Sequence, residues 1–335
     1  MNQRKLGKSG PTVSALGLGC MGMSDFYGPA DRGESIATIQ AALDAGITLL
    51  DTGDFYGMGH NEMLIAEAVT GRRREDYQLS VKFGALRDPA MGWSGYDSRP
   101  AAVKNFLAYT LRRLGVDYID IYRPSRLDPT VPIEDTVGAI ADMVEAGYVR
   151  RIGLSEIGAD TLRRAHAVHP IGDLQIEYSL ISRGIEHEIL PAARELGIGI
   201  TAYGVLSRGL ISGHWSKARV GERDFRAISP RFQGANLDRN LALVEQLRAV
   251  ADRIGASVAQ VAIAWVAAQG TDIVPLVGAR RRERLTEALG ALDVRLSSED
   301  VAALTSAVPT EAVAGDRYPA SQLAHMDSEK GRAHA

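Results

Sequence analysis

Short apolar runs alternate with longer amphipathic stretches along most of this chain of 335 residues. Apolar positions at helical spacing predict helices, and the short runs between them predict strands. The predicted strands cover residues 13–19, 47–50, 78–81, 118–122, 149–154, 174–176, 198–202 and 273–276. The predicted helices cover residues 34–45, 62–69, 101–114, 133–146, 161–168, 187–196, 241–254, 258–268 and 282–289. This order favours a parallel sheet, because parallel strands need a long crossover that a helix supplies.

Eight strand–helix units predict an α/β fold of the (β/α)8 barrel type. An open, doubly wound sheet is the alternative, and the period of the pattern does not separate the two. A small hairpin is expected around residues 8–10, and an extra helix over 298–307 with Ser297 or Ser298 as its N-cap. No Pro- or Ser-rich linker divides the chain, so residues 1–335 are predicted to form one domain with a partly loop-like tail, 309–335. The polar stretch 207–240 is predicted to be a loop that covers a ligand at the end of the seventh strand.

The charge balance narrows the classes of partner. The chain has 38 Lys and Arg against 41 Asp and Glu, a net charge of −3, which argues against a nucleic-acid-binding or polybasic membrane-binding surface. No apolar run approaches the roughly 20 residues of a membrane helix, and the N-terminal residues are polar. The single cysteine, Cys20, excludes an intrachain disulfide, and the seven histidines show no metal-ligand spacing. We therefore expect a cytoplasmic protein without a metal site; the sequence permits a homo-oligomer but does not specify one.

Residues 17–22 match the dinucleotide fingerprint G-x-G-x-x-G and follow a predicted strand. That fingerprint also needs a helix that begins within the glycines and holds the pyrophosphate at its N-terminus. Here the glycines are followed by residues 23–29, which have loop composition. The segment is therefore interpreted as a Gly-rich loop at one end of a barrel rather than as a dinucleotide-binding turn.

Three residues near the ends of neighbouring strands have complementary chemistry. Asp51 ends the second predicted strand, Tyr56 follows in the loop, and Lys82 ends the third strand. The carboxyl ends of barrel strands form the catalytic face, so these side chains are expected to converge. A neighbouring ammonium would favour the phenolate of Tyr56, which could then give its proton to a substrate oxygen. A buried Asp–Lys pair beside a packing tyrosine is an equally simple interpretation of the spacing.

Several ordered motifs resemble those of the aldo-keto reductase superfamily. The segment from Asp51 to Glu62, DTGDFYGMGHNE, is similar to the family's D-T-A-x-x-Y-G-x-G-x-N-E signature. Further similar segments are LRRLGVDYID at 111–120, GLSE at 153–156, QIEY at 175–178, AYGVLSRGL at 202–210 and GARRRERLTEA at 278–288. The stretch RFQGAN at 231–236 is most similar to the long-chain bacterial and plant branch. The resemblance runs from about residue 4 to residue 320.

This resemblance implies a TIM barrel that binds NADPH across its C-terminal face, with Asp51, Tyr56 and Lys82 as three of four catalytic residues. Tyr203 would stack on the nicotinamide, and the arginine forks near 280 suit the extra 2′-phosphate, so NADP is expected rather than NAD. The expected cofactor-binding residues are Met21, Ser155, Glu156, Gln175, Tyr203, Gly204, Leu206, Arg208, Gly209, Leu210, Gly278, Arg280, Arg284, Glu287 and Ala288. Gly204 and Ala288 stand where the family usually has Ser and Asn, which removes two side-chain hydrogen bonds.

The main departure from the family is Ser125, which occupies the place of the fourth catalytic residue, a histidine. Serine is shorter and carries no charge near neutral pH. The predicted function is NADPH-dependent reduction of aldehydes or ketones, with Tyr56 as general acid. The alternatives are another hydride reaction, such as C=C reduction or oxidation of an alcohol or sugar, and a weakly active regulatory protein that binds NADPH.

The predicted partner is a small-molecule carbonyl substrate. Aromatic side chains in the loops around the barrel mouth suit an apolar or ring-bearing compound. Arg123 is a candidate to reach into the space that Ser125 leaves. The expected substrate-pocket residues are Tyr27, Phe55, Trp93, Arg123, Arg126 and Tyr318, with Phe26, Met91, Tyr96 and Arg317 as further wall candidates.

Overall fold

A closed, parallel eight-stranded barrel forms the centre of the molecule. The computed structural model describes residues 1–24, 26–215 and 224–330. The barrel strands are β3 (Gly17–Gly19), β4 (Leu49–Gly53), β5 (Gln78–Phe83), β8 (Ile119–Pro124), β9 (Val149–Ser155), β10 (Ile171–Glu177), β11 (Gly199–Tyr203) and β12 (Ile273–Gly278). They pair in chain order, and β12 returns to β3 to close the barrel. The closure confirms the predicted (β/α)8 barrel and rules out the open sheet.

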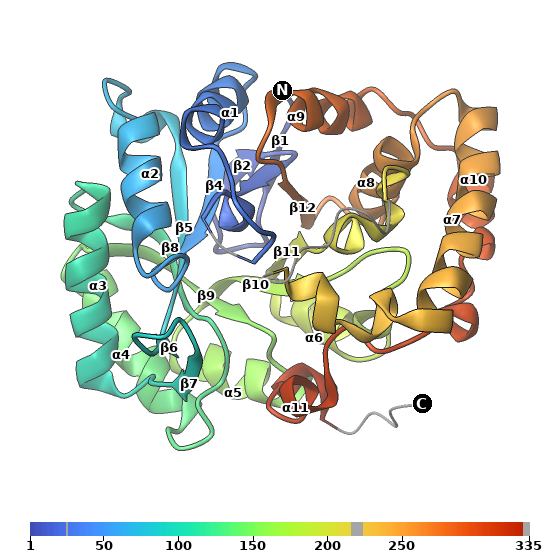
Figure 1. The fold of residues 1–335 in the computed structure, drawn as a ribbon. Coiled ribbons are helices and arrows are strands. Elements are labelled where there is room, and N and C mark those ends of the chain that lie inside the picture. Colours follow the sequence, from blue (N-terminus) through green and yellow to red (C-terminus); the bar gives the residue numbers. More distant parts are fainter. Residues whose placement is uncertain (25, 216–223, 331–335) are drawn as a thin grey trace.

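Helices follow the strands and cover the outside of the barrel (Figure 1). They are α1 (Arg32–Asp44), α2 (His60–Ala68), α3 (Pro100–Leu114), α4 (Ile133–Glu145), α5 (Ala159–Val168), α6 (Ile189–Leu196), α7 (Gly234–Ile254), α8 (Val258–Ala268) and α9 (Arg282–Leu289). The extra helix α10 (Ser298–Ala307) is capped by Ser297, whose side chain accepts a hydrogen bond from the amide of Asp300. Helix α3 ends at Gly115, which takes a left-handed conformation with φ 66°, as a C-terminal glycine does.

An antiparallel hairpin of β1 (Gln3–Lys5) and β2 (Thr12–Ser14) precedes the barrel, as predicted. Its side chains Leu6 and Val13 are fully buried and pack with Leu49, Ile121 and Val274 from inside the barrel. The predicted run 13–19 is therefore divided: its first part belongs to this hairpin, and β3 begins only at Gly17. The hairpin closes the barrel at the end opposite the carboxyl ends of the strands.

Two parts of the fold differ from the sequence prediction. A second hairpin, β6 (Ala85–Arg87) and β7 (Trp93–Tyr96), follows β5 where only loop was expected. Helix α7 begins seven residues earlier than predicted, at 234 instead of 241. Its first turns carry polar residues such as Asn240, which is buried and donates to the carbonyl of Ala314 at 2.8 Å. Tertiary hydrogen bonds of this kind are invisible to hydrophobic periodicity.

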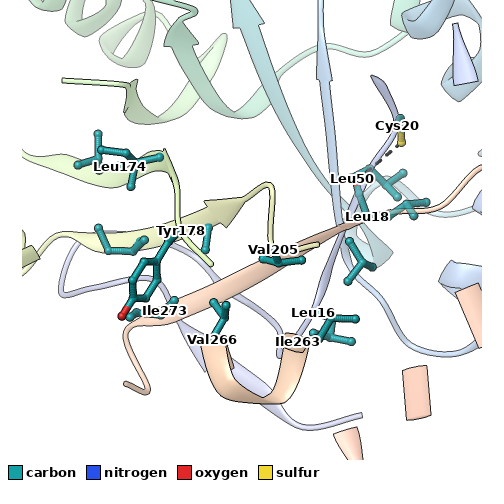
Figure 2. Packing of buried hydrophobic residues seen from close by; sticks show 14 of the residues in the cluster. Leu16, Leu18, Cys20, Leu50, Leu174, Tyr178, Val205, Ile263, Val266 and Ile273 are labelled. Atoms are coloured by element: carbon teal, nitrogen blue, oxygen red, sulfur yellow. Dashed lines mark hydrogen bonds between the residues drawn. The ribbon is translucent and has the colours of Figure 1, made fainter. Parts of the chain in front are cut away.

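The main core lies between the barrel and the helices around it. In the view of Figure 2, Leu16 lies next to Ile263 of α8, while Leu18 and Leu50 lie together farther from that helix; all are members of one buried cluster with Val266. No single described helix is long and apolar enough to cross a membrane; α7 and α8 pass that test only as a pair bent by 84°. The apolar character of α8 is explained by burial, because it is enclosed between the barrel and neighbouring helices.

The C-terminal segment contains more structure than the predicted loop. Short helical turns lie at Thr310–Ala312 and Asp327–Glu329, with α11 (Ala320–Leu323) between them. In the predicted ligand-covering stretch, 3-10 turns occupy Ser207–Ser212, Phe225–Ile228 and Pro230–Phe232. The remaining part of that prediction, residues 216–223, lies outside the described residues.

Candidate active site

A large cavity opens at the carboxyl ends of the barrel strands. Its volume is about 890 Å³, which is enough for a dinucleotide part and a small substrate. Most residues selected from the sequence lie on its wall: Met21, Tyr27, Asp51, Phe55, Tyr56, Lys82, Trp93, Ser125, Arg126, Ser155, Gln175, Tyr203, Gly204, Leu206, Arg208, Gly209, Gly278, Arg280, Arg284, Glu287, Ala288 and Tyr318. Arg123, Glu156 and Leu210 do not line it, and neither do Met91 and Arg317.

Asp51 and Lys82 form a buried ion pair at the floor of the cavity. In the register of β4 and β5, Gly53 pairs with Lys82, so Asp51 lies two residues before the partner of Lys82. The side chains of Asp51 and Lys82 both face inward and meet, and Lys82 Nζ donates to Asp51 Oδ1. The other carboxylate oxygen accepts from Ser80 Oγ at 2.7 Å and from Gln175 Nε2 at 2.6 Å. Three donors thus hold the carboxyl group of Asp51 in place, and burial lowers the pKa of Lys82 against the opposing effect of Asp51.

Tyr56 lies beside this pair. Its ring centroid is 5.3 Å from Lys82 Nζ and 4.7 Å from the ring of Phe55, which it meets edge-on. Burial, helped by the charge of Asp51, raises the pKa of Tyr56 well above its usual value, and Arg126 opposes this only in part. The expected lowering of this pKa by the ammonium of Lys82 is not observed, because burial dominates, and Tyr56 keeps its proton near neutral pH.

Ser125 follows directly after β8. It is 3% exposed, and its amide donates to the carbonyl of Phe83 at 2.8 Å. Its hydroxyl oxygen has no hydrogen-bond partner among the described residues. Ser125 thus forms a small, polar corner of the cavity wall at the position where the family resemblance predicts an imidazole.

Arg123 corrects one expectation from the sequence. Its side chain is fully buried inside the barrel, where Nη1 donates to Asp173 Oδ2 at 3.0 Å and Nη2 to Ser80 Oγ at 2.8 Å. Alternation along β8 explains this, because Ile121 and Arg123 face the barrel interior while Tyr122 faces the helices. Arg123 therefore supports Asp51 from below through Ser80 and does not fill the corner at Ser125.

Glu156 and Leu210 are also placed differently from the expectation that they contact a cofactor. Leu210 is fully buried in the core. Glu156 is fully buried behind Tyr203 and accepts its hydroxyl hydrogen bond at 2.6 Å. Burial alone would raise the pKa of Glu156, but the charge and hydrogen bonds of Arg317 lower it well below the usual range. The two residues therefore act on the cavity indirectly, Glu156 by orienting Tyr203.

Arg317 is a residue whose role the sequence did not reveal. Its guanidinium is 11% exposed and lies 2.9 Å from Glu156, 3.3 Å from Glu177 and 2.6 Å from Glu329. The following residue, Tyr318, has its hydroxyl 2.9 Å from that of Tyr203. The C-terminal segment is thus anchored by a buried charge network to the wall that carries Tyr203.

One end of the cavity has the features of an anion site. Ser207, Arg208 and Gly209 have φ of 45°, 56° and 92°, a run of left-handed residues that is costly outside functional sites. Arg208 Nη1 is buried without a hydrogen-bond partner among the described residues. Its Nη2 lies 3.6 Å from Glu177. A guanidinium with an unused donor suits a phosphate oxygen.

Further arginines line the same end of the cavity. Arg280 donates to the carbonyl of Tyr27 at 3.0 Å, and so ties the loop after β3 to the end of β12. Arg284 donates to Glu287 at 3.0 Å, and Glu287 also accepts from His214 at 2.8 Å. His214 was not selected from the sequence, because no motif marks it.

The residues present fit a phosphorylated dinucleotide. Ser155 lines the middle of the cavity with a buried hydroxyl oxygen that has no partner in the described part of the chain. Tyr203 also lines the cavity and offers an aromatic side chain. Unused polar atoms in the middle and cations at one end match an amide-bearing ring joined to phosphates.

The opposite end of the cavity is aromatic. Phe26 lies 5.8 Å from both Tyr56 and Trp93, measured between ring centroids. Tyr96 from the unpredicted hairpin and Gln322, His325 and Met326 from the C-terminal segment complete the wall. The part of the cavity wall that comes from the C-terminal segment could not be inferred from the sequence, because residues 320–326 carry no motif that predicts their packing against the barrel.

The comparisons with known proteins agree with this geometry. The sequence model of the aldo/keto reductase family matches residues 15–309. The chain belongs to the aldo/keto reductase family. A curated relative, probable aldo-keto reductase 1 from Glycine max, is 44% identical over 317 residues, which cover 94% of this chain and 91% of the relative. Family membership makes the protein an oxidoreductase that acts on carbonyls, in a family that uses nicotinamide cofactors.

Solved structures of other aldo-keto reductases are similar to this one. The glycerol dehydrogenase AKR11B4 from Gluconobacter oxydans has a TM-score of 0.82 at 27% identity, covering 91% of this chain and 94% of that one. The holo form of aldo-keto reductase AKR11C1 from Bacillus halodurans has a TM-score of 0.77 at 27% identity, covering 92% and 97%. The thermostable aldo-keto reductase Tm1743, in complex with the inhibitor epalrestat, has a TM-score of 0.74 at 28% identity, covering 92% and 100%.

Proposed function

We propose that this aldo-keto reductase reduces aldehydes or ketones to alcohols with NADPH, and that Tyr56 is the proton donor. The observation that carries the proposal is the grouping of Asp51, Lys82 and a protonated Tyr56 on one cavity wall. Steady-state rates of NADPH oxidation against a panel of aromatic aldehydes, diketones and ketones test it. Tight NADPH binding without turnover of any panel member would contradict it.

Each residue of the group has a distinct task. NADPH, when bound, supplies the hydride that the carbonyl carbon receives. Tyr56 donates its hydroxyl proton to the carbonyl oxygen, and the ammonium of Lys82 near its ring stabilises the phenolate left behind. Asp51 holds Lys82 charged and in place. The aromatic wall excludes water, which strengthens these electrostatic interactions.

We propose NADP rather than NAD because Arg280, Arg281 and Arg284 line one end of the cavity. Arg284→Gln is expected to lower the preference for NADPH over NADH by about tenfold, the effect of losing one charge-assisted hydrogen bond. Fluorescence titration with both cofactors measures this ratio. Arg282→Gln is the matched control, since Arg282 is on the same helix as Arg284, pairs with Glu34 of α1 and does not line the cavity. An unchanged ratio in Arg284→Gln would contradict the assignment.

The open corner at Ser125 is proposed to accommodate larger substrates. Ser125→His fills it, so we expect the ratio of kcat/KM for a small aldehyde to that for a ring-bearing aldehyde to rise by about tenfold. Ser125→Ala is the control, because it removes the hydroxyl and leaves the space. An equal ratio in the histidine variant and the wild type would show that the corner does not select by size.

A second candidate is the oxidation of small alcohols, because one similar structure is a glycerol dehydrogenase. Initial rates with NADP⁺ and glycerol, set beside those with NADPH and aldehydes, decide between the two directions. We also propose a cytoplasmic location; the buried, free Cys20 supports it, since reduced thiols are usual there.

A further inference from the structure

Arg126 differs from Lys82, Arg208 and Arg226, which also line the cavity and face carboxylates of the protein. Arg208 faces Glu177, and Arg226 forms an ion pair with Asp224. Arg126 makes one hydrogen bond, from Nη1 to the carbonyl of Ser125 at 2.6 Å. No carboxylate in the described ranges forms an ion pair with it. Its guanidinium therefore lines the cavity with no direct ion pair, although the charge of the buried Glu156 acts on it from a distance.

The position of Arg126 is at the aromatic end, next to the reacting hydroxyl. Its charge acts on Tyr56, whose pKa it lowers against the larger effect of burial. Phe26, Phe55 and Tyr96 line the same region. Cofactor phosphates are expected near Arg280, which follows β12, the strand across the barrel from β8. Arg126 is thus available to the substrate.

A guanidinium with one protein hydrogen bond and no ion pair keeps further N–H donors for a ligand of opposite charge. A carboxylate is the best match, because it accepts two parallel hydrogen bonds from a guanidinium. The small side chain of Ser125, whose hydroxyl is also unpartnered among the described residues, leaves room for such a group beside Arg126.

We propose that Arg126 binds a carboxylate of the substrate, so that the preferred substrates are aldehydes or ketones that also carry a carboxylate. This inference rests on the proposed carbonyl reduction and specifies its substrate class. Arg126 is then a specificity-determining residue, and the aromatic wall holds the apolar part that joins the carboxylate to the carbonyl.

The test uses pairs of aldehydes that differ in charge and hardly in shape. The 2-, 3- and 4-carboxybenzaldehydes are compared with the corresponding nitrobenzaldehydes, because a nitro group is a neutral isostere of a carboxylate. For at least one isomer, the carboxy-to-nitro ratio of kcat/KM is expected to exceed one in the wild type. In Arg126→Gln that ratio is expected to fall by about tenfold to a hundredfold, the effect of losing a charged hydrogen-bond pair.

Two variants control the result. Arg126→Lys keeps the charge but not the bidentate geometry, so it should retain part of the preference. Arg99→Gln changes the net charge equally at an exposed position outside the cavity, and its ratio should equal that of the wild type. Equal losses for carboxy and nitro compounds in Arg126→Gln would overturn the proposal and assign Arg126 to polarising the carbonyl.

Direct binding distinguishes failure of this inference from failure of the proposed function. Calorimetric titration with the three carboxybenzyl alcohols and their nitro counterparts needs no turnover. Selective carboxylate binding that is lost in Arg126→Gln supports the inference even if no aldehyde is reduced. Reduction of nitrobenzaldehydes without any carboxylate preference, in rate or in binding, overturns it while the proposed function stands.

Discussion

Tyr56→Phe is expected to lower kcat for aldehyde reduction by about 10²–10⁴-fold, the usual contribution of a general acid. The substitution removes only the hydroxyl, because the ring contacts with Phe55 and Phe26 remain available to phenylalanine. Cofactor binding should therefore persist while the proton transfer is lost. Rates of NADPH oxidation at saturating aldehyde, measured beside an NADPH titration, separate the two quantities.

Tyr109→Phe is the matched control for that substitution. Tyr109 is 58% exposed on α3, far from the cavity wall, so the same chemical change there should leave kcat within about twofold. Undiminished turnover in Tyr56→Phe, with an unchanged circular dichroism spectrum, would remove Tyr56 from the proton-transfer step.

Arg317→Met is expected to destabilise the protein by about 3–5 kcal/mol, because it leaves the fully buried Glu156 without its cation. The midpoint of urea denaturation should fall accordingly. Arg164→Met is the control: Arg164 and Glu134 form an exposed ion pair, whose loss should cost less than about 1 kcal/mol. Equal midpoints for Arg317→Met and the wild type would show that the network does not stabilise the fold.

The stability deficit of Arg317→Met is expected to depend on pH through Glu156, and the added Glu156→Gln substitution tests that assignment. In the wild type Arg317 lowers the pKa of Glu156, so that stabilisation is present above the unfolded pKa of about 4.3 and is lost as pH falls below it. Without Arg317, burial raises the pKa of Glu156, and the variant loses stability as pH rises. The deficit should therefore be larger at about pH 8 than at about pH 5. Adding Glu156→Gln should restore much of the loss.

The sequence was sufficient to predict the parts of the site that depend on strand order. Asp51 and Lys82 meet because β4 and β5 are adjacent and paired in register, a consequence of the strand–helix alternation itself. Ser125 was identified through the family resemblance instead, and the structure places it directly after the next strand, β8. Such residues are placed by the backbone of the barrel, which the hydrophobic pattern describes well.

The parts that were mispredicted depend on long-range side-chain contacts. Arg123 was expected at the cavity, but its side chain lies inside the barrel. It follows Ile121 by two residues, so alternation along β8 puts both side chains on the interior face, and this spacing could have predicted its position. Glu156 was expected at the cofactor, but its partner Arg317 lies 161 residues away in the chain. No local pattern connects two such positions, because buried ion pairs leave no periodic trace.

The hairpin at the N-terminus also determines when the barrel can be completed during synthesis. Arg4 donates to the carbonyls of Ala267, Gly270 and Ile273, the last at 2.6 Å. These contacts cannot form until nearly the whole barrel has left the ribosome, and the edge of β3 stays unpaired until β12 arrives. The nascent chain must therefore keep an open strand edge from pairing with other chains for most of its translation.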